Sequence, residues 1–127
     1  MANSSDYEQI LNVLAIYCHA LDDGQYQRLA EIFDNDTVYE LTGGPYVGVA
    51  ESVAALERLL GAEPTKRHLN FNHFVTIAGD RATVRSDWYS LNRGDSGLAF
   101  AAGGTWNDSL EKRNSRWIIT HRSIHRL

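Results

Sequence analysis

Residues 68–78, His-Leu-Asn-Phe-Asn-His-Phe-Val-Thr-Ile-Ala, alternate between polar and apolar side chains over much of their length, as a half-buried β-strand does. Gly79-Asp80 then supplies a tight turn into a second strand candidate at 82–92. Two more strand candidates follow at 98–110 and 116–125, with polar turns between them. The second half of the chain therefore predicts an antiparallel meander.

The first half of the chain has helical spacing instead. Ser5 and Glu8 have the arrangement of a capping box, in which a hydroxyl and a glutamate three residues later satisfy free helix N–H groups. Apolar residues then recur at helical spacing over 6–21, and Asp22-Asp23-Gly24 is typical of a helix end. A short helix, a break, a β-prone stretch and a third helix are predicted in turn at 26–33, 34–36, 37–41 and 49–60.

Helices followed by a meander predict an α+β fold, with the helices packed on one face of a curved sheet. The chain has 127 residues, a length that suits one domain covering 1–127. We find no repeat, linker or low-complexity segment in it.

Composition and charge exclude several classes of protein. The net charge of −4 shows no basic surplus, so we expect no nucleic-acid partner. No apolar run approaches the roughly 20 residues of a membrane span, and the first residues lack the pattern of a signal peptide. Cys18 is the single cysteine and has no internal partner, which favours a reducing, cytoplasmic location.

Some motif matches carry no weight. Gly94-Asp95-Ser96-Gly97 resembles a serine-protease loop, but the chain is too short for that fold. His121 and His125 fall in a predicted strand, where four residues span about 13 Å, too far apart to share one ion. We therefore expect no metal and no cofactor. Cys18 lies in the first predicted helix and is expected to be a buried thiol rather than a nucleophile.

General acid–base groups remain. Asp22 and Asp23 end the first helix, where aspartates are either solvated or available for chemistry. Strand alternation puts His68 on a polar face with two asparagines and His73 on the opposite, apolar face. A β-bulge between the two histidines would exchange those positions. The polar face is expected to hold His68, Asn70 and Asn72. The apolar face is expected to hold Leu69, Phe71, Val75 and Ile77.

Several segments resemble SnoaL-like proteins of the nuclear-transport-factor-2-like superfamily. They are Tyr17-Cys18-His19-Ala20-Leu21-Asp22-Asp23-Gly24, Leu29-Ala30-Glu31-Ile32-Phe33 with Asp36, the helix ending at Leu59-Leu60, Arg67-His68-Leu69 with Asn72, Gly79-Asp80-Arg81-Ala82, and the tail from Leu110 to Ile119. The resemblance implies a cone-shaped α+β barrel, in which a curved sheet wraps around N-terminal helices and encloses an apolar pocket. The superfamily includes dehydratases, isomerases, polyketide cyclases and binding modules, so the fold alone does not give the function.

The resemblance also implies site residues. Its dehydratase-like members use an Asp–His pair that corresponds here to Asp22 and His68, with a tyrosine that corresponds to Tyr17. Asp87 matches a further acidic residue, and Trp106 stands where many members carry Tyr or Arg. The expected substrate contacts are Tyr39, Tyr46, Asn72, Asp87, Trp88 and Trp106.

Such a pair suits proton transfer. A neutral His68 removes a proton while Asp22 holds the ring tautomer, and Tyr17 polarises an oxygen of the substrate. We expect a cofactor-independent lyase or isomerase of the dehydratase type, acting on a cyclic or polycyclic small molecule. The alternatives are a SnoaL-type polyketide cyclase and a non-catalytic ligand-binding or assembly module. A homodimer or higher homo-oligomer is expected, joined through the apolar outer face of the sheet.

Overall fold

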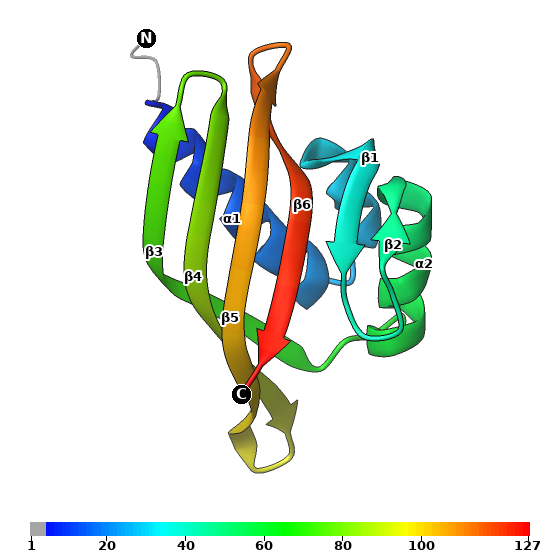
Figure 1. Cartoon of the computed structure of the whole chain (residues 1–127). Coiled ribbons are helices and arrows are strands. Elements are labelled where there is room, and N and C mark those ends of the chain that lie inside the picture. Colours follow the sequence, from blue (N-terminus) through cyan, green and yellow to red (C-terminus); the bar gives the residue numbers. More distant parts are fainter. Residues whose placement is uncertain (1–4) are drawn as a thin grey trace, which may run out of the picture.

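The computed structural model describes residues 5–127, in which the helices lie against the inner face of a curved, six-stranded sheet (Figure 1). The elements are α1 (Asp6–Asp22), the 3₁₀ helix η1 (Tyr26–Glu31), β1 (Phe33–Glu40), β2 (Tyr46–Val47), α2 (Gly48–Leu60), β3 (Lys66–Ala78), β4 (Arg81–Gly94), β5 (Gly97–Arg113) and β6 (Arg116–Arg126). The strand order is β2-β1-β6-β5-β4-β3, antiparallel except for the β1–β6 pair. The predicted α+β fold, with helices packed in a curved mixed sheet, is confirmed, although the six strands do not close into a barrel.

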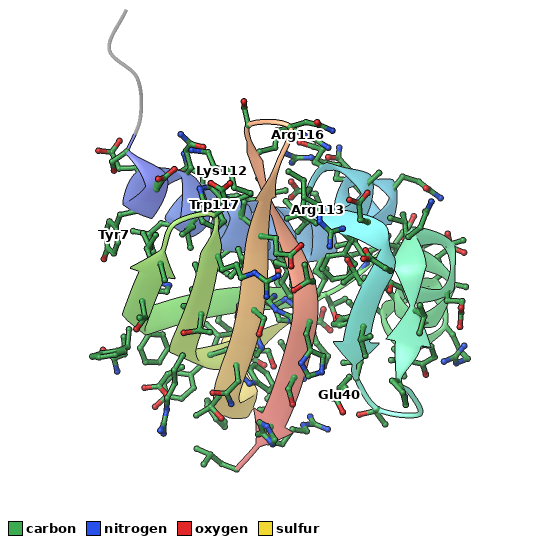
Figure 2. All side chains as sticks on the ribbon, turned by 45° about the horizontal axis from the view of Figure 1, so that its top comes forward. Tyr7, Glu40, Lys112, Arg113, Arg116 and Trp117 are labelled. Atoms are coloured by element: carbon green, nitrogen blue, oxygen red, sulfur yellow. The ribbon has the colours of Figure 1, made fainter. Side chains whose placement is uncertain are left out.

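The first helix is fixed at its start by the contacts that the sequence predicts and by two that it does not. The Ser5 hydroxyl accepts a hydrogen bond from the Glu8 backbone N–H at 3.1 Å, as the capping box requires. The Asp6 carboxylate also accepts hydrogen bonds from Lys112 Nζ and Trp117 Nε1, both at 3.0 Å. Lys112 and Trp117 lie beside the start of α1 in Figure 2. The β5–β6 hairpin therefore holds the helix against the sheet.

The segment after α1 differs from its prediction. The short helix is a 3₁₀ helix that ends at Glu31, and the expected break at 34–36 lies inside strand β1. Arg113 of β5 binds this polar stretch, with Nη1 3.0 Å from Asp34 Oδ2 and 2.8 Å from Asp36 Oδ1. The Thr37 hydroxyl donates to the Ile119 carbonyl at 2.6 Å. Contacts with distant strands thus hold in an extended form a sequence whose local preference is for a turn.

Strand β3 contains a β-bulge between the two histidines, but it does not exchange them, because His68 precedes the bulge and stays on the inner face opposite the buried Ser90. Its register with β4 shifts between Phe71 and Phe74, and Asn72 has a φ of 55°. One extra residue there reverses the alternation for the rest of the strand. His73 consequently lies on the inner face, where its Nε2 is 2.7 Å from Asn70 Oδ1.

The bulge also corrects the predicted apolar face. Leu69 and Phe71 lie on the outer face of the sheet, as expected. Val75 and Ile77 lie on the inner face instead, because they pair with Val84 and Ala82, which are buried against the helices. The apolar set of four residues is therefore divided between the two faces.

Strands β5 and β6 approach so closely at Gly104 that only glycine fits. A Cβ atom at that position would lie 1.7 Å from the carbonyl oxygen of His125, which also accepts a hydrogen bond from Trp88 Nε1 at 3.3 Å. We expect Gly104→Ala to lower the free energy of unfolding by about 1–3 kcal/mol, because the strand backbone has to move. Urea denaturation measures this loss. Gly94→Ala is the matched control, since a Cβ there would meet nothing within 4 Å, and an equal loss in both variants would contradict the argument.

Candidate active site

A cavity of about 210 Å³ lies between the helices and the inner face of the sheet. Its walls are mostly apolar, with leucines from α1 and α2 facing aromatic residues from the sheet. Apolar walls with some polar groups among them are typical of a small-molecule site. The lining residues used below are Tyr17, Tyr39, Lys66, His68, Trp88, Trp106 and Arg126.

Asp22 and His68 form a hydrogen-bonded pair at the cavity wall. Asp22 is the last residue of α1, and the start of β3 passes beside it. One carboxylate oxygen, Oδ1, lies 2.8 Å from His68 Nδ1 and accepts the His68 backbone N–H at 2.9 Å. The side chains are only 6% and 10% exposed. Arg67 Nε, 3.8 Å from the other carboxylate oxygen, adds a positive charge on the solvent side.

This geometry assigns the tautomer of the imidazole. An ionised carboxylate only accepts hydrogen bonds, so Nδ1 of a neutral His68 carries the proton. Nε2 is then the unprotonated nitrogen, and within residues 5–127 it has no hydrogen-bond partner. His68 lines the cavity, whereas Asp22 stands behind it. A histidine held in this way by a carboxylate is chemically able to accept a proton at Nε2.

Tyr17 and Tyr39 place two hydroxyl groups in the same cavity. Tyr17 comes from the middle of α1 and Tyr39 from β1, and their hydroxyl groups hydrogen-bond to each other. Burial raises the pKa of Tyr17 to about 12 and that of Tyr39 well above its ordinary value. Both phenols therefore stay protonated at neutral pH. One of the two O–H groups is used in their mutual hydrogen bond, and the other is able to donate to a ligand.

A buried ion pair that the sequence analysis missed lies behind Tyr17. Arg122 of β6 donates to Asp108 of β5 twice, from Nε to Oδ1 at 2.6 Å and from Nη2 to Oδ2 at 2.9 Å, and both side chains are 0% exposed. The guanidinium carbon lies 4.1 Å from the ring centroids of both Tyr17 and Trp106. Nη1 has no hydrogen-bond partner among residues 5–127.

The sequence does contain a signal for Asp108, one of the two residues of this pair. Asp108 lies two residues from Trp106 and two from Leu110, so strand alternation puts a charge on an otherwise apolar face. The inward position of its partner, Arg122, could not be predicted in this way. The register of β5 and β6 shifts just before Arg122 and breaks the alternation of β6.

Three of the predicted substrate contacts lie elsewhere. Asn72 Nδ2 donates to Asp87 Oδ2 at 2.9 Å on the outer face of the sheet, because Asp87 lies between the inward, buried Ser86 and Trp88. The Tyr46 hydroxyl donates to the Thr42 carbonyl at 2.9 Å and accepts from Arg58 Nη2 at 2.7 Å. None of the three lines the cavity, whereas Tyr39, Trp88 and Trp106 do.

The remaining nucleophilic and metal-ligating side chains are less suited to form a catalytic or metal site. Burial raises the pKa of the Cys18 thiol to about 12, so it stays protonated and is a poor nucleophile. Within residues 5–127 no three His, Cys, Asp or Glu side chains come together in a way that could hold a metal ion. None of the helices in that range is both long and apolar enough to cross a membrane.

The fold and the site define a class of small proteins. In this class a curved mixed sheet packs around N-terminal helices and leaves an apolar cavity between them. The chain belongs to the SnoaL-like domain family, whose model matches residues 2–123. This family is part of the nuclear-transport-factor-2-like superfamily, which includes cofactor-independent isomerases, dehydratases and cyclases. A comparison with curated proteins gave no match.

Solved structures show the same fold. A protein of unknown function with a cystatin-like fold from Nostoc punctiforme is 25% identical, with a TM-score of 0.88 over 100% of this chain and 96% of that one. A nuclear-transport-factor-2-like protein from Novosphingobium aromaticivorans is 23% identical, with a TM-score of 0.85 over 96% and 82% of the two chains. A candidate scytalone dehydratase from the same organism is 20% identical, with a TM-score of 0.81 over 96% and 84%.

Proposed function

We propose that the protein is a cofactor-independent lyase or isomerase that removes a proton from a carbon next to a carbonyl group in a small ring-bearing molecule. The observation that carries this proposal is the hydrogen bond between Asp22 and His68, which leaves Nε2 as a base at the cavity wall. Family membership supports it, since the superfamily includes enzymes of this type.

The proposed reaction uses only groups that line or support the cavity. His68 Nε2 takes the proton as the C–H bond breaks, and the electron pair moves into the carbonyl group to form an enolate. The Asp22 carboxylate stabilises the imidazolium that results. In a dehydration, a β-hydroxyl then leaves and takes the proton from His68, so that water is released. In an isomerisation, His68 returns the proton to another carbon.

Tyr17 is the proposed hydrogen-bond donor to the enolate oxygen. Its hydroxyl is neutral and buried, and a donor in such a site stabilises developing negative charge more strongly than one in water. The positive charge of Arg122, whose guanidinium carbon lies 4.1 Å from the centroid of the Tyr17 ring, makes this hydroxyl a better donor. General acid–base assistance of this kind contributes a rate factor of about 10²–10⁴.

The size of the cavity narrows the substrate class. Its volume of about 210 Å³ is below the range of about 300–1,000 Å³ that is usual for drug-sized ligands. Stacked Trp88 and Trp106, with ring centroids 6.3 Å apart, offer flat apolar surfaces. We therefore propose a substrate of one ring or two fused rings rather than a larger polycyclic molecule.

Hydrogen–deuterium exchange tests the proposal without knowledge of the natural substrate. A panel of one- and two-ring ketones and β-hydroxyketones, including 1-tetralone, is incubated in D₂O. Loss of the proton signal next to the carbonyl, and loss of water, are followed by NMR. Wild type is expected to accelerate at least one reaction, and His68→Gln to abolish the acceleration. No acceleration by the wild type on any compound, or equal rates in both proteins, would overturn it.

We also propose that two copies of the chain associate through the outer face of β3, β4 and β5. Phe74 and Phe100 are 72% and 63% exposed there, and Phe71, Tyr89 and Phe100 form a chain of edge-to-face contacts. Arg85 and Asp87 lie on the same face with opposite charges. A two-fold arrangement would pair Arg85 of each copy with Asp87 of the other, so the surface is complementary to itself.

Sedimentation velocity at micromolar concentration measures this association. We expect a dimer for the wild type and a monomer for Phe74→Lys combined with Phe100→Lys, because two charges per copy would be buried. Tyr7→Lys is the control, since Tyr7 is 48% exposed but lies on α1. A monomeric wild type, or a dimer that survives the double substitution, would refute the proposed interface.

A further inference from the structure

Two basic residues line the cavity at the end of the sheet where β3 begins and β6 ends. Lys66 precedes His68 by two residues and shares its face of β3, whereas Arg126 closes β6. The successive antiparallel pairings of β3, β4, β5 and β6 bring these two strand ends to one edge, which is the lower edge in Figure 1. Both cations therefore come from strand ends near the same edge of the sheet, and both line the cavity.

These charges are not neutralised by the protein itself. Lys66 Nζ is bound at 3.0 Å by an uncharged acceptor, Asn92 Oδ1, which orients it. No carboxylate within residues 5–127 forms a salt bridge with either cation. The residues that line the cavity include no aspartate or glutamate. The chain as a whole carries a net charge of −4, so the positive character of this edge is local.

The cavity lining therefore combines two kinds of chemistry. Aromatic rings, the Tyr17 hydroxyl and the imidazole of His68 share it with two cations at strand ends. A molecule that satisfies both has an apolar ring and an acidic substituent on its edge. Binding of the acidic group by these cations would also restrict which carbon of the ring faces His68.

We propose that the substrate of this site is a ring compound that carries a carboxylate, held by Lys66 and Arg126 while the ring lies against Trp88 and Trp106. This inference rests on the proposed function for its reaction, but the binding preference itself requires no turnover. The cavity volume of about 210 Å³ favours a compact anion such as a carboxylate over a larger acidic group.

Calorimetric titration with a matched pair of ligands tests the inference. Naphthalene-2-carboxylate and naphthalene-2-carboxamide have the same ring and nearly the same shape, and only the first is charged. The wild type is expected to bind the carboxylate about tenfold more tightly. Lys66→Gln combined with Arg126→Gln should remove this preference and leave the affinity for the amide unchanged. Raising the salt concentration should reduce the preference in the wild type.

Arg81→Gln combined with Arg116→Gln is the charge-matched control, because it also removes two positive charges. Arg81 and Arg116 begin β4 and β6 and are not part of the cavity lining, so their loss changes the net charge but should leave the preference intact. Equal binding of the two ligands by the wild type, binding of neither ligand, or a preference that survives the double substitution would overturn the inference. His68→Gln separates it from the proposed function, because this variant should lose exchange activity and still prefer the carboxylate.

Discussion

Asp108→Ala is expected to lower the free energy of unfolding by about 3–5 kcal/mol, because it leaves the charge of Arg122 buried without a partner. Both side chains are fully buried, and Asp108 accepts two hydrogen bonds from the guanidinium group. The rings of Tyr17 and Trp106 on either side supply only cation–π attraction, which does not replace a carboxylate. Urea denaturation followed by far-ultraviolet circular dichroism measures the loss.

A double substitution shows that the loss comes from the unpaired charge rather than from the missing side chain. Asp108→Leu with Arg122→Met replaces the pair by apolar groups of similar size, and stability should recover most of the loss. Asp36→Ala is the matched control at the surface, because the Asp36 carboxylate pairs with Arg113 but is well exposed. A similar loss in Asp36→Ala and Asp108→Ala, or no recovery in the double variant, would contradict this account.

Asp22→Asn is expected to reduce the exchange or dehydration rate by a factor of about 10²–10⁴. The amide keeps the size of the side chain and retains an oxygen to accept the His68 backbone N–H, which is 2.9 Å from Oδ1. It removes the negative charge that stabilises the imidazolium, and its NH₂ group can favour the wrong tautomer of the ring. Single-turnover rates on the compound that the wild type exchanges fastest measure the effect.

The neighbouring Asp23 provides the control for Asp22. It is the C-cap residue of α1, bears the same charge and forms no salt bridge among residues 5–127. Asp23→Asn should retain the wild-type rate, and the melting temperature of Asp22→Asn should stay close to that of the wild type. A rate loss in both variants, or a normal rate with a lower melting temperature in Asp22→Asn alone, would make the Asp22–His68 pair structural rather than catalytic.

Elements with strong local signals were predictable from the sequence. The capping box and apolar spacing of the first helix placed it at 6–21, and the structure has it at Asp6–Asp22. The four strands of the second half also lie where alternation predicts them. The failures are at 34–36 and at Asn72. In the first, Arg113 from a distant strand binds the polar residues, and in the second a bulge reverses the alternation.

The same distinction between local signals and long-range contacts applies to the residues predicted for the cavity. Asp22 and His68 were found because each stands at the end or start of an element, where a short segment of sequence and a family resemblance are informative. Asn72 lies outside the cavity because the bulge turns it to the outer face, and Asp87 lies outside because it alternates with the inward Trp88. Tyr46 is held away from the cavity by its hydrogen bonds with Thr42 and Arg58.

The kinds of element and their order follow from the amino-acid sequence alone, because helix and strand periodicities and caps are local properties. The family resemblance of its short motifs pointed to Asp22 and His68 as the candidate pair. Tertiary packing sets which residues share the cavity, Lys66 and Arg126 among them, and it brings Asp108 and Arg122 together as a buried pair. These contacts join residues from different strands, and a shift of one residue in register moves a side chain to the opposite face of the sheet. Pairing between strands, which no local pattern specifies, therefore determined the chemistry of the cavity.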